Sequence, residues 1–283
     1  MTRKENEKIP FTGHLEELRK RLITCFISIS IGFVLSYAFK EKLFEILSQP
    51  LISAMDKGDK LIFTGLPEAF FTYLKVSLLS GLMLSAPVIL YQFWMFVAPG
   101  LYKKERGLLT PIVILSSFFF IGGSLFGYFI VFPYGFKFFL GFASETIRPL
   151  PSMREYLGFS AKLLLAFGVV FELPLVLTFL ARLGIISVDF LKKNRKYALL
   201  LFFAGAAIIT PPDVVTQIMM ALPMMVLYEI SIIGARIFGK KKSEEQEKTE
   251  KQEKTEKQEK TEKQEKTEKQ EETEKPAEKD KSS

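Results

Sequence analysis

The sequence predicts an all-α polytopic membrane protein with six transmembrane helices, cytoplasmic N- and C-termini, and a short helical hairpin as its last two helices. Composition is the first observation: the 283 residues include 28 Phe, and the mean hydropathy is +0.20. The second is that charged residues gather in short clusters between long apolar runs, as in membrane proteins. The third is an unequal distribution of Lys and Arg between alternate loops.

The six spans follow from the apolar runs, because a helix needs about 20 apolar residues to cross roughly 30 Å of hydrocarbon. The fifth run has 14 residues, which reach only about 21 Å, and two prolines separate it from the sixth. These two runs are therefore predicted to form a short hairpin. The predicted spans are residues 22–39, 76–98, 107–136, 157–181, 197–210 and 214–235.

The orientation follows from the basic residues on alternate sides of the six spans. Residues 1–21, 99–106, 182–196 and 236–242 together hold 18 Lys and Arg, whereas the loops on the other side hold 9. Loops rich in Lys and Arg stay in the cytoplasm. Both ends of the membrane part are therefore predicted to be cytoplasmic.

Two regions are expected, a membrane domain at 1–242 and a charged low-complexity cytoplasmic tail at 243–283. The first 242 residues carry 27 basic and 16 acidic side chains. From Glu247 the tail repeats the hexad Glu-Lys-Thr-Glu-Lys-Gln four times, with no apolar residue to bury. The first apolar run lacks a small-residue cleavage site, so a removable signal peptide is not expected.

The segment FTGHLEELRKRLI (11–23) places acids among bases just before the first span. Thr12 is expected to cap a helix that begins near Gly13 and lies along the interface before turning inward. Glu17 precedes Arg21 by four residues, so a local ion pair is one interpretation. Glu105 is likewise a lone acid in a basic loop. The other interpretation is that the two acids bind a cation, and the planar guanidinium of arginine suits carboxylates best.

Polar residues inside the predicted spans are the other candidate sites. Glu172 lies among apolar residues, so it is expected to be neutral, paired or facing a wet cavity. It either bonds a neighbouring helix or contacts an inserted peptide or partner helix. Thr210 and Gln217 flank the Pro-Pro turn, where they either stabilise the turn or offer a docking point to a partner helix with a polar group.

The segment 40–69 mixes apolar and charged residues around Pro50. This pattern is expected for short amphipathic helices that lie over the outer end of the bundle. They would form either a lid or a merely structural cover.

Five motifs in order resemble the TatC family, the receptor subunit of the twin-arginine protein translocase. They extend over roughly residues 11–238, and six spans with cytoplasmic ends are the topology of that family. The motifs are HLEELR (14–19), SAPVILYQFW (85–94), LYKKE (101–105), AFGVVFELP (166–174) and TPPDV (210–214).

The resemblance implies a multi-pass protein of the cytoplasmic (inner) membrane that binds twin-arginine signal peptides of folded precursors, with export driven by the proton-motive force. It implies small single-span partners of the TatA/TatB type and oligomers within a larger complex, while the basic surface is expected to contact anionic lipid. The arginine pair would meet Glu17 and Glu105. The family also gives importance to Leu18, Arg19, Phe96, Pro50, Tyr128, Glu172, Asp213 and Gln217, whereas Pro87 is expected to be structural.

Two other classes of function fit the sequence less well. A proton-coupled small-solute transporter would explain Glu172 and the short hairpin, but it predicts an internal repeat that the sequence lacks. A membrane-embedded enzyme would need a nucleophile with a base, or metal ligands, and the only His is His14. No enzymatic activity, cofactor, metal or nucleic-acid partner is therefore expected.

Overall fold

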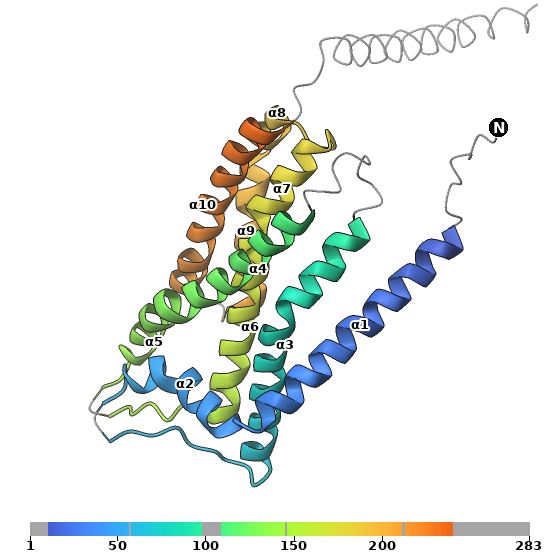
Figure 1. Cartoon of the computed structure of the whole chain (residues 1–283). Coiled ribbons are helices and arrows are strands. Elements are labelled where there is room, and N and C mark those ends of the chain that lie inside the picture. The colour runs from blue at the N-terminus through green and yellow to red at the C-terminus, as the bar shows by residue number, and fades with distance from the viewer. Residues whose placement is uncertain (1–10, 57, 98–108, 145, 211–212, 240–283) are drawn as a thin grey trace, which may run out of the picture.

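The structure, a computed structural model, describes residues 11–56, 58–97, 109–144, 146–210 and 213–239. Every predicted span corresponds to a helix or to consecutive helices (Figure 1). The predicted tail, its boundary with the membrane domain, and Glu105 lie outside the described residues. The elements are α1 (Phe11–Tyr37), α2 (Lys40–Ile52), α3 (Glu68–Val97), α4 (Leu109–Phe126), η3 (Gly127–Val131), α5 (Phe132–Leu140), α6 (Met153–Phe171), α7 (Leu173–Arg182), α8 (Val188–Lys193), α9 (Arg195–Ile209) and α10 (Val214–Phe238).

Length and hydropathy separate the segments that could cross a membrane alone from those that could not. Within the described residues, four segments could each cross a membrane alone: Glu68–Val97, Thr110–Leu140, Met153–Arg182 and Val214–Phe238. A fifth requires α1 to be counted with α2, which bends away from it by 87°. The predicted short helix is α9, with 15 residues, and with α10 it forms the predicted hairpin. Helix α1 begins and α10 ends at the end of the bundle opposite α2 (Figure 1), as an even number of crossings requires.

The prediction for the opening segment was wrong in one respect. Helix α1 runs without a break from Phe11 to Tyr37, so its charged start does not lie along the interface before turning inward. The helix already includes Thr12, whose side chain lies outside the described part of the structure. The reason is that no proline lies between residues 11 and 37, and an existing helix extends at little cost.

Small residues let two helix pairs approach closely. A Cβ added to Gly32 of α1 would come within 2.5 Å of the Gly81 carbonyl oxygen of α3. Beside this contact, the Ser85 hydroxyl donates to the Ser28 carbonyl oxygen at 2.8 Å. A Cβ on Gly123 of α4 would likewise meet the Phe167 carbonyl oxygen of α6 at 2.5 Å. Close packing at small residues is what holds helices together in lipid.

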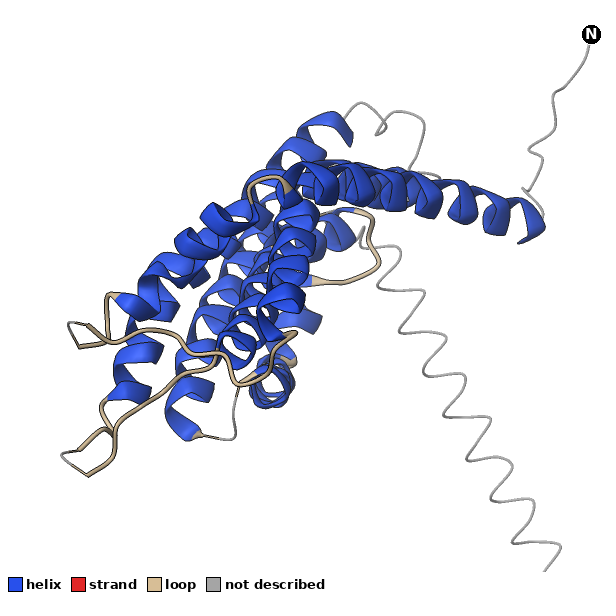
Figure 2. Cartoon of the chain, turned by 90° about the horizontal axis from the view of Figure 1, so that it is seen from below, coloured by secondary structure: helices blue, strands red, loops and turns tan. Residues whose placement is uncertain are grey.

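The main core is a cluster of buried side chains from α2, α3 and the elements from η3 to α10, and aromatic side chains fill much of it. Phe132, Phe136 and Phe167 are buried with Leu157 and Met220. Many large apolar side chains on the outside of the helices are exposed instead, as expected for surfaces that face lipid. In both views α1 lies at the edge of the bundle, packed along α3 (Figures 1 and 2).

The cap end is the end of the bundle formed by α2 and the segments 53–67 and 141–152. Helix α2 lies across it (Figure 1), so of the short amphipathic helices predicted for 40–69 the structure has one, and the described residues of 53–67 form no helix. Backbone bonds tie the two segments together: Ile62 donates to Pro151 at 3.1 Å and accepts from Met153 at 2.8 Å. Arg148 forms an ion pair with Asp59, which raises the pKa of Arg148. The cap end is thus one hydrogen-bonded unit.

Pro50 and Tyr128, to which the family resemblance gives importance, act on the same helical turn. Pro50 lies inside α2 and has no N–H, so it cannot bond the carbonyl of Ile46 four residues earlier. The Tyr128 hydroxyl donates to that carbonyl at 2.6 Å. Tyr128 reaches it from η3, a π-helical turn between α4 and α5, and the Tyr156 hydroxyl donates to the next carbonyl, that of Leu47. Tyrosine hydroxyls from two helices therefore bond to α2 at the turn where Pro50 removes one of its own backbone hydrogen bonds.

Tyr128→Phe removes the donor to the Ile46 carbonyl, so we expect the free energy of unfolding to fall by about 1 kcal/mol. Thermal unfolding in detergent would measure the loss. In a Pro50→Ala background the new N–H bonds the same carbonyl, so Tyr128→Phe should cost less there. Tyr134→Phe, at an exposed tyrosine of α5, is the matched control. Equal losses in both backgrounds would contradict the link between Pro50 and Tyr128.

Candidate functional site

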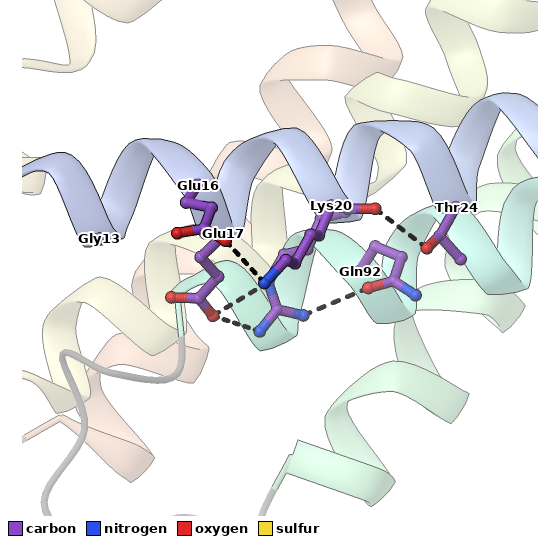
Figure 3. A pocket seen from close by; sticks show the side chains of 7 residues that line it. Gly13, Glu16, Glu17, Lys20, Thr24 and Gln92 are labelled. Atoms are coloured by element: carbon purple, nitrogen blue, oxygen red, sulfur yellow. Dashed lines mark hydrogen bonds and ion pairs between the residues drawn. The ribbon is translucent and has the colours of Figure 1, made fainter.

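Glu17 of α1 binds a basic side chain of its own chain (Figure 3). The Arg21 guanidinium, one helical turn later, donates to Glu17 Oε1 through Nε at 3.1 Å and also through Nη2. Its third nitrogen, Nη1, donates to Gln92 Oε1 of α3 at 3.2 Å. The local ion pair that the spacing allowed is therefore present, and it also joins α1 to α3.

This ion pair lines an open polar cavity of about 410 Å³ between α1 and α3. The side chains of Glu17 and Arg21 are 26% and 17% exposed, so water still reaches both. Ion pairs that solvent reaches contribute at most about 1 kcal/mol, so Arg21 can be exchanged for another guanidinium. Glu16 and Lys20 form a second, more exposed pair on the rim, with their charged atoms 2.9 Å apart.

The other predicted binding residues lie on the same two helices. Leu18 is half-buried and Arg19 exposed on α1, while the half-buried Phe96 lies one residue before the end of α3. Glu105 is outside the described residues, so its convergence with Glu17 remains a prediction. The structure does place Glu17 and Phe96 near the same end of the bundle (Figure 1).

Glu172 is buried and forms the junction between α6 and α7, one residue before Leu173 and two before Pro174. The Ser116 hydroxyl of α4 donates to Glu172 Oε2 at 2.6 Å, and Trp94 Nε1 of α3 donates to Ser116 Oγ at 3.0 Å. The bond to a neighbouring helix, one of the two interpretations of Glu172, is therefore present. Three helices meet at this chain of hydrogen bonds.

One oxygen of Glu172 accepts no hydrogen bond in this network. Glu172 Oε1 is buried and has no hydrogen-bond partner among the described residues, while Oε2 is bonded. A buried acceptor without a donor costs roughly 1–3 kcal/mol, so this oxygen is a favourable place for a donor from another chain. The bond to Ser116 and a contact with an inserted helix are thus compatible.

The polar residues of the hairpin stabilise its turn. The Thr210 hydroxyl donates to the Ala206 carbonyl, and the Gln217 amide donates to the Phe203 carbonyl, each at 2.9 Å. Asp213 caps α10 by accepting from the Thr216 backbone N–H at 2.7 Å. Stabilisation of the turn, one interpretation of Thr210 and Gln217, is present, and a docking role remains a prediction. Pro87 lies inside α3 on an exposed face, which agrees with a structural role.

Sequence reasoning missed Ser116 and Trp94, which bond in the Glu172 network. It also missed Glu68 at the cap end, whose carboxylate accepts from the backbone of Thr64 and Arg154. Glu68 begins α3, where an acid is favourable beside the helix N-terminus, and that position was the available signal. Ser116 and Trp94 carried no signal, because a serine and a tryptophan in an apolar run give no indication of which neighbour they meet. Among the described residues, no group of three or more His, Cys, Asp or Glu could hold a metal ion.

Comparison with known proteins identifies the family of this chain. The family model described as "Sec-independent protein translocase protein (TatC)" matches residues 13–223. A protein of that name from Desulforapulum autotrophicum is 70% identical over 244 residues, which cover 86% of this chain and 90% of the relative. The protein of the same name from Escherichia coli is 40% identical over 238 residues, 84% of this chain and 92% of the relative.

A solved structure is also similar. It is described as "Crystal Structure of Twin Arginine Translocase Receptor- TatC", and the two chains are 41% identical with a TM-score of 0.72. The match covers 80% of this chain and 99% of that chain. The residues, the fold and the relatives agree: this chain belongs to the TatC family of Sec-independent protein translocase proteins.

Proposed function

We propose that this chain is the receptor and scaffold of a twin-arginine translocase, and that Glu17 and Glu105 together bind the arginine pair of a signal peptide. The observation that carries the proposal is the cavity between α1 and α3, in which Glu17 already binds a guanidinium. An arginine of the signal offers the same planar fork as Arg21. Exchanging one guanidinium for the other preserves the charge-assisted bonds, whereas a lysine ammonium cannot reproduce the fork.

The geometry also gives Arg21 a place in this exchange. Gln92 accepts a hydrogen bond from Arg21 Nη1, so Arg21 retains a partner on α3 when it releases Glu17. Leu18, Arg19 and Phe96, close to this cavity along α1 and α3, would contact the residues around the arginine pair. The bases on this end of the bundle would contact anionic lipid and orient the peptide.

We infer that this end of the bundle is cytoplasmic and that the membrane is the cytoplasmic (inner) membrane. The support is the excess of Lys and Arg on the loops of this side, 18 against 9. With that orientation the cap end faces outward, and the cavity beside Glu17 is accessible to precursors before export.

Partner subunits are the second part of the proposal. Small single-span subunits of the TatA/TatB type would dock a polar group near Thr210, Asp213 and Gln217 or at Glu172. The support at Glu172 is the buried Oε1, which accepts no hydrogen bond from the described residues. Oligomers of this chain with such partners would move folded cargo with energy from the proton-motive force.

Glu105→Ala should weaken binding of a twin-arginine signal peptide by roughly tenfold or more, because a charge-assisted bond contributes about 1.5–3 kcal/mol. Fluorescence anisotropy with the purified protein in detergent would measure it. The Glu17/Glu105 double variant should bind the Arg-Arg peptide no better than wild type binds a Lys-Lys peptide.

Glu229→Gln is the matched control, because Glu229 is an acid already paired with Arg195 at 2.8 Å on the hairpin helices. It should leave affinity for the peptide near that of the wild type. Photo-crosslinking from position 105 should favour the Arg-Arg precursor over Lys-Lys. Equal binding by the wild type and the double variant would end the proposal.

Ser116→Ala removes the donor to Glu172 and leaves the Trp94 N–H unpaired, so we expect about 1–3 kcal/mol of destabilisation and reduced export of a twin-arginine reporter. The matched control is Ser117→Ala, since that hydroxyl bonds only the Val113 carbonyl of its own helix. Thermal unfolding and an export assay in cells would compare the two. Indistinguishable variants would show that Glu172 does not depend on Ser116.

A further inference from the structure

A second cavity, of about 650 Å³, lies at the cap end where α3 and α6 begin. It lies at the far end of α3 from the Glu17 cavity (Figure 1). The charged side chains that line it are Glu68, Lys75, Arg154 and Glu155. Nothing in the proposed receptor function uses this cavity.

Glu68 forms part of the wall, and its carboxylate is occupied by hydrogen bonds. Its Oε2 accepts from the Thr64 N–H at 2.8 Å, the Thr64 hydroxyl at 3.1 Å and the Gly65 N–H at 3.2 Å. Its Oε1 accepts from the Arg154 backbone N–H at 3.1 Å. Glu68 thus fixes the start of α6 against α3, and these backbone donors satisfy both of its oxygens. It has no need of the two cations nearby.

The cations of the cavity are Lys75 and Arg154. Both side chains are exposed, and neither forms an ion pair or side-chain hydrogen bond with any residue that the structure describes. Glu155, the remaining acid, is exposed too, and within the described part of the chain it pairs with neither cation. Lys75 and Arg154 therefore line one cavity, and because backbone donors already satisfy Glu68, both cations are available to bind an anion.

The depth of Lys75 indicates where this anion comes from. Lys75 is seven residues into α3, about 10 Å along the axis from Glu68. It shares a helical stripe with Phe71 and Leu78, which are 54% and 50% exposed and have the apolar character of a lipid-facing surface. A lysine on such a stripe extends its ammonium toward the membrane boundary, which here is the cavity.

We propose that this cavity binds the phosphate of a phospholipid in the leaflet at the cap end. Lys75 and Arg154 bind the phosphate oxygens, and the acyl chains lie along Phe71 and Leu78. A phospholipid is favoured over a free anion because the cation site continues directly into the apolar stripe. The two charge-assisted contacts together fix a lipid at the boundary between α3 and α6.

The test is a titration of the full chain in detergent with phosphatidylglycerol, followed by native mass spectrometry. Lys75→Gln with Arg154→Gln should weaken lipid binding by about tenfold or more. The matched control is Lys60→Gln with Lys137→Gln, which also removes two charges from exposed lysines at or near the cap end but outside the cavity. Equal affinity of the two double variants would overturn the proposal.

Two competition experiments distinguish a bound phospholipid from a lipid without phosphate and from free phosphate. Diacylglycerol, which lacks the phosphate, should not displace the bound lipid, and inorganic phosphate should not compete at matched concentration. Competition by either compound equal to that of the lipid would also overturn the assignment. Lys75→Arg with Arg154→Lys retains both charges and should bind within a few-fold of the wild type, which separates loss of the site from loss of the fold. Binding of the signal peptide at the other end should be unchanged in all variants.

Discussion

The structure depends on one constraint, which is that hydrocarbon supplies no hydrogen-bond partners to a polar group. Most buried polar side chains therefore bond to donors or acceptors of the protein itself, and among the described residues Ser160 Oγ and Glu172 Oε1 are the buried side-chain atoms without a partner. Glu172 accepts a hydrogen bond from the Ser116 hydroxyl, and the Ser116 oxygen accepts one from the Trp94 indole N–H. The free carbonyl that Pro50 leaves on α2 receives the Tyr128 hydroxyl. These bonds fix the relative positions of helices far apart in sequence, so satisfying polar groups also sets the architecture.

The two ends of the bundle use the same physics for different purposes. At the cap end, carboxylate and tyrosine side chains bond to backbone groups and so fix the segments relative to one another. At the other end, Glu17 is held by a side chain that solvent reaches and that another guanidinium can replace. Bonds to backbone cannot be exchanged for a ligand, whereas an ion pair between side chains can. The contacts at the cap end therefore fix the backbone, whereas the ion pair at the other end would allow one guanidinium to take the place of another.

Periodicity and hydropathy were sufficient to predict the spans, the short hairpin and the amphipathic helix over the cap end, because burial in lipid leaves a long signal in the sequence. The helix at the start of the chain was predicted to bend where its charges end, and it does not. Charge alone does not break a helix; a proline or an unsatisfied backbone would have been needed. The pair of Glu17 and Arg21 was foreseeable from its spacing of four residues. Ser116 and Trp94 were not, because their partners come from other helices, and a single sequence carries no record of which helices are neighbours.

The unbroken course of α1 has a mechanical consequence. Its close contact with α3 at Gly32 and Gly81 is 15 residues and about 22 Å along the axis from Glu17. The part of α1 between Glu17 and this contact would act as a rigid arm that turns about the glycine pair. A displacement of about 2 Å at Glu17 would rotate the whole rod by roughly 5° about the glycine pair, given that arm length. A ligand bound beside Glu17 would in this way also shift the other end of α1, where the chain continues into α2.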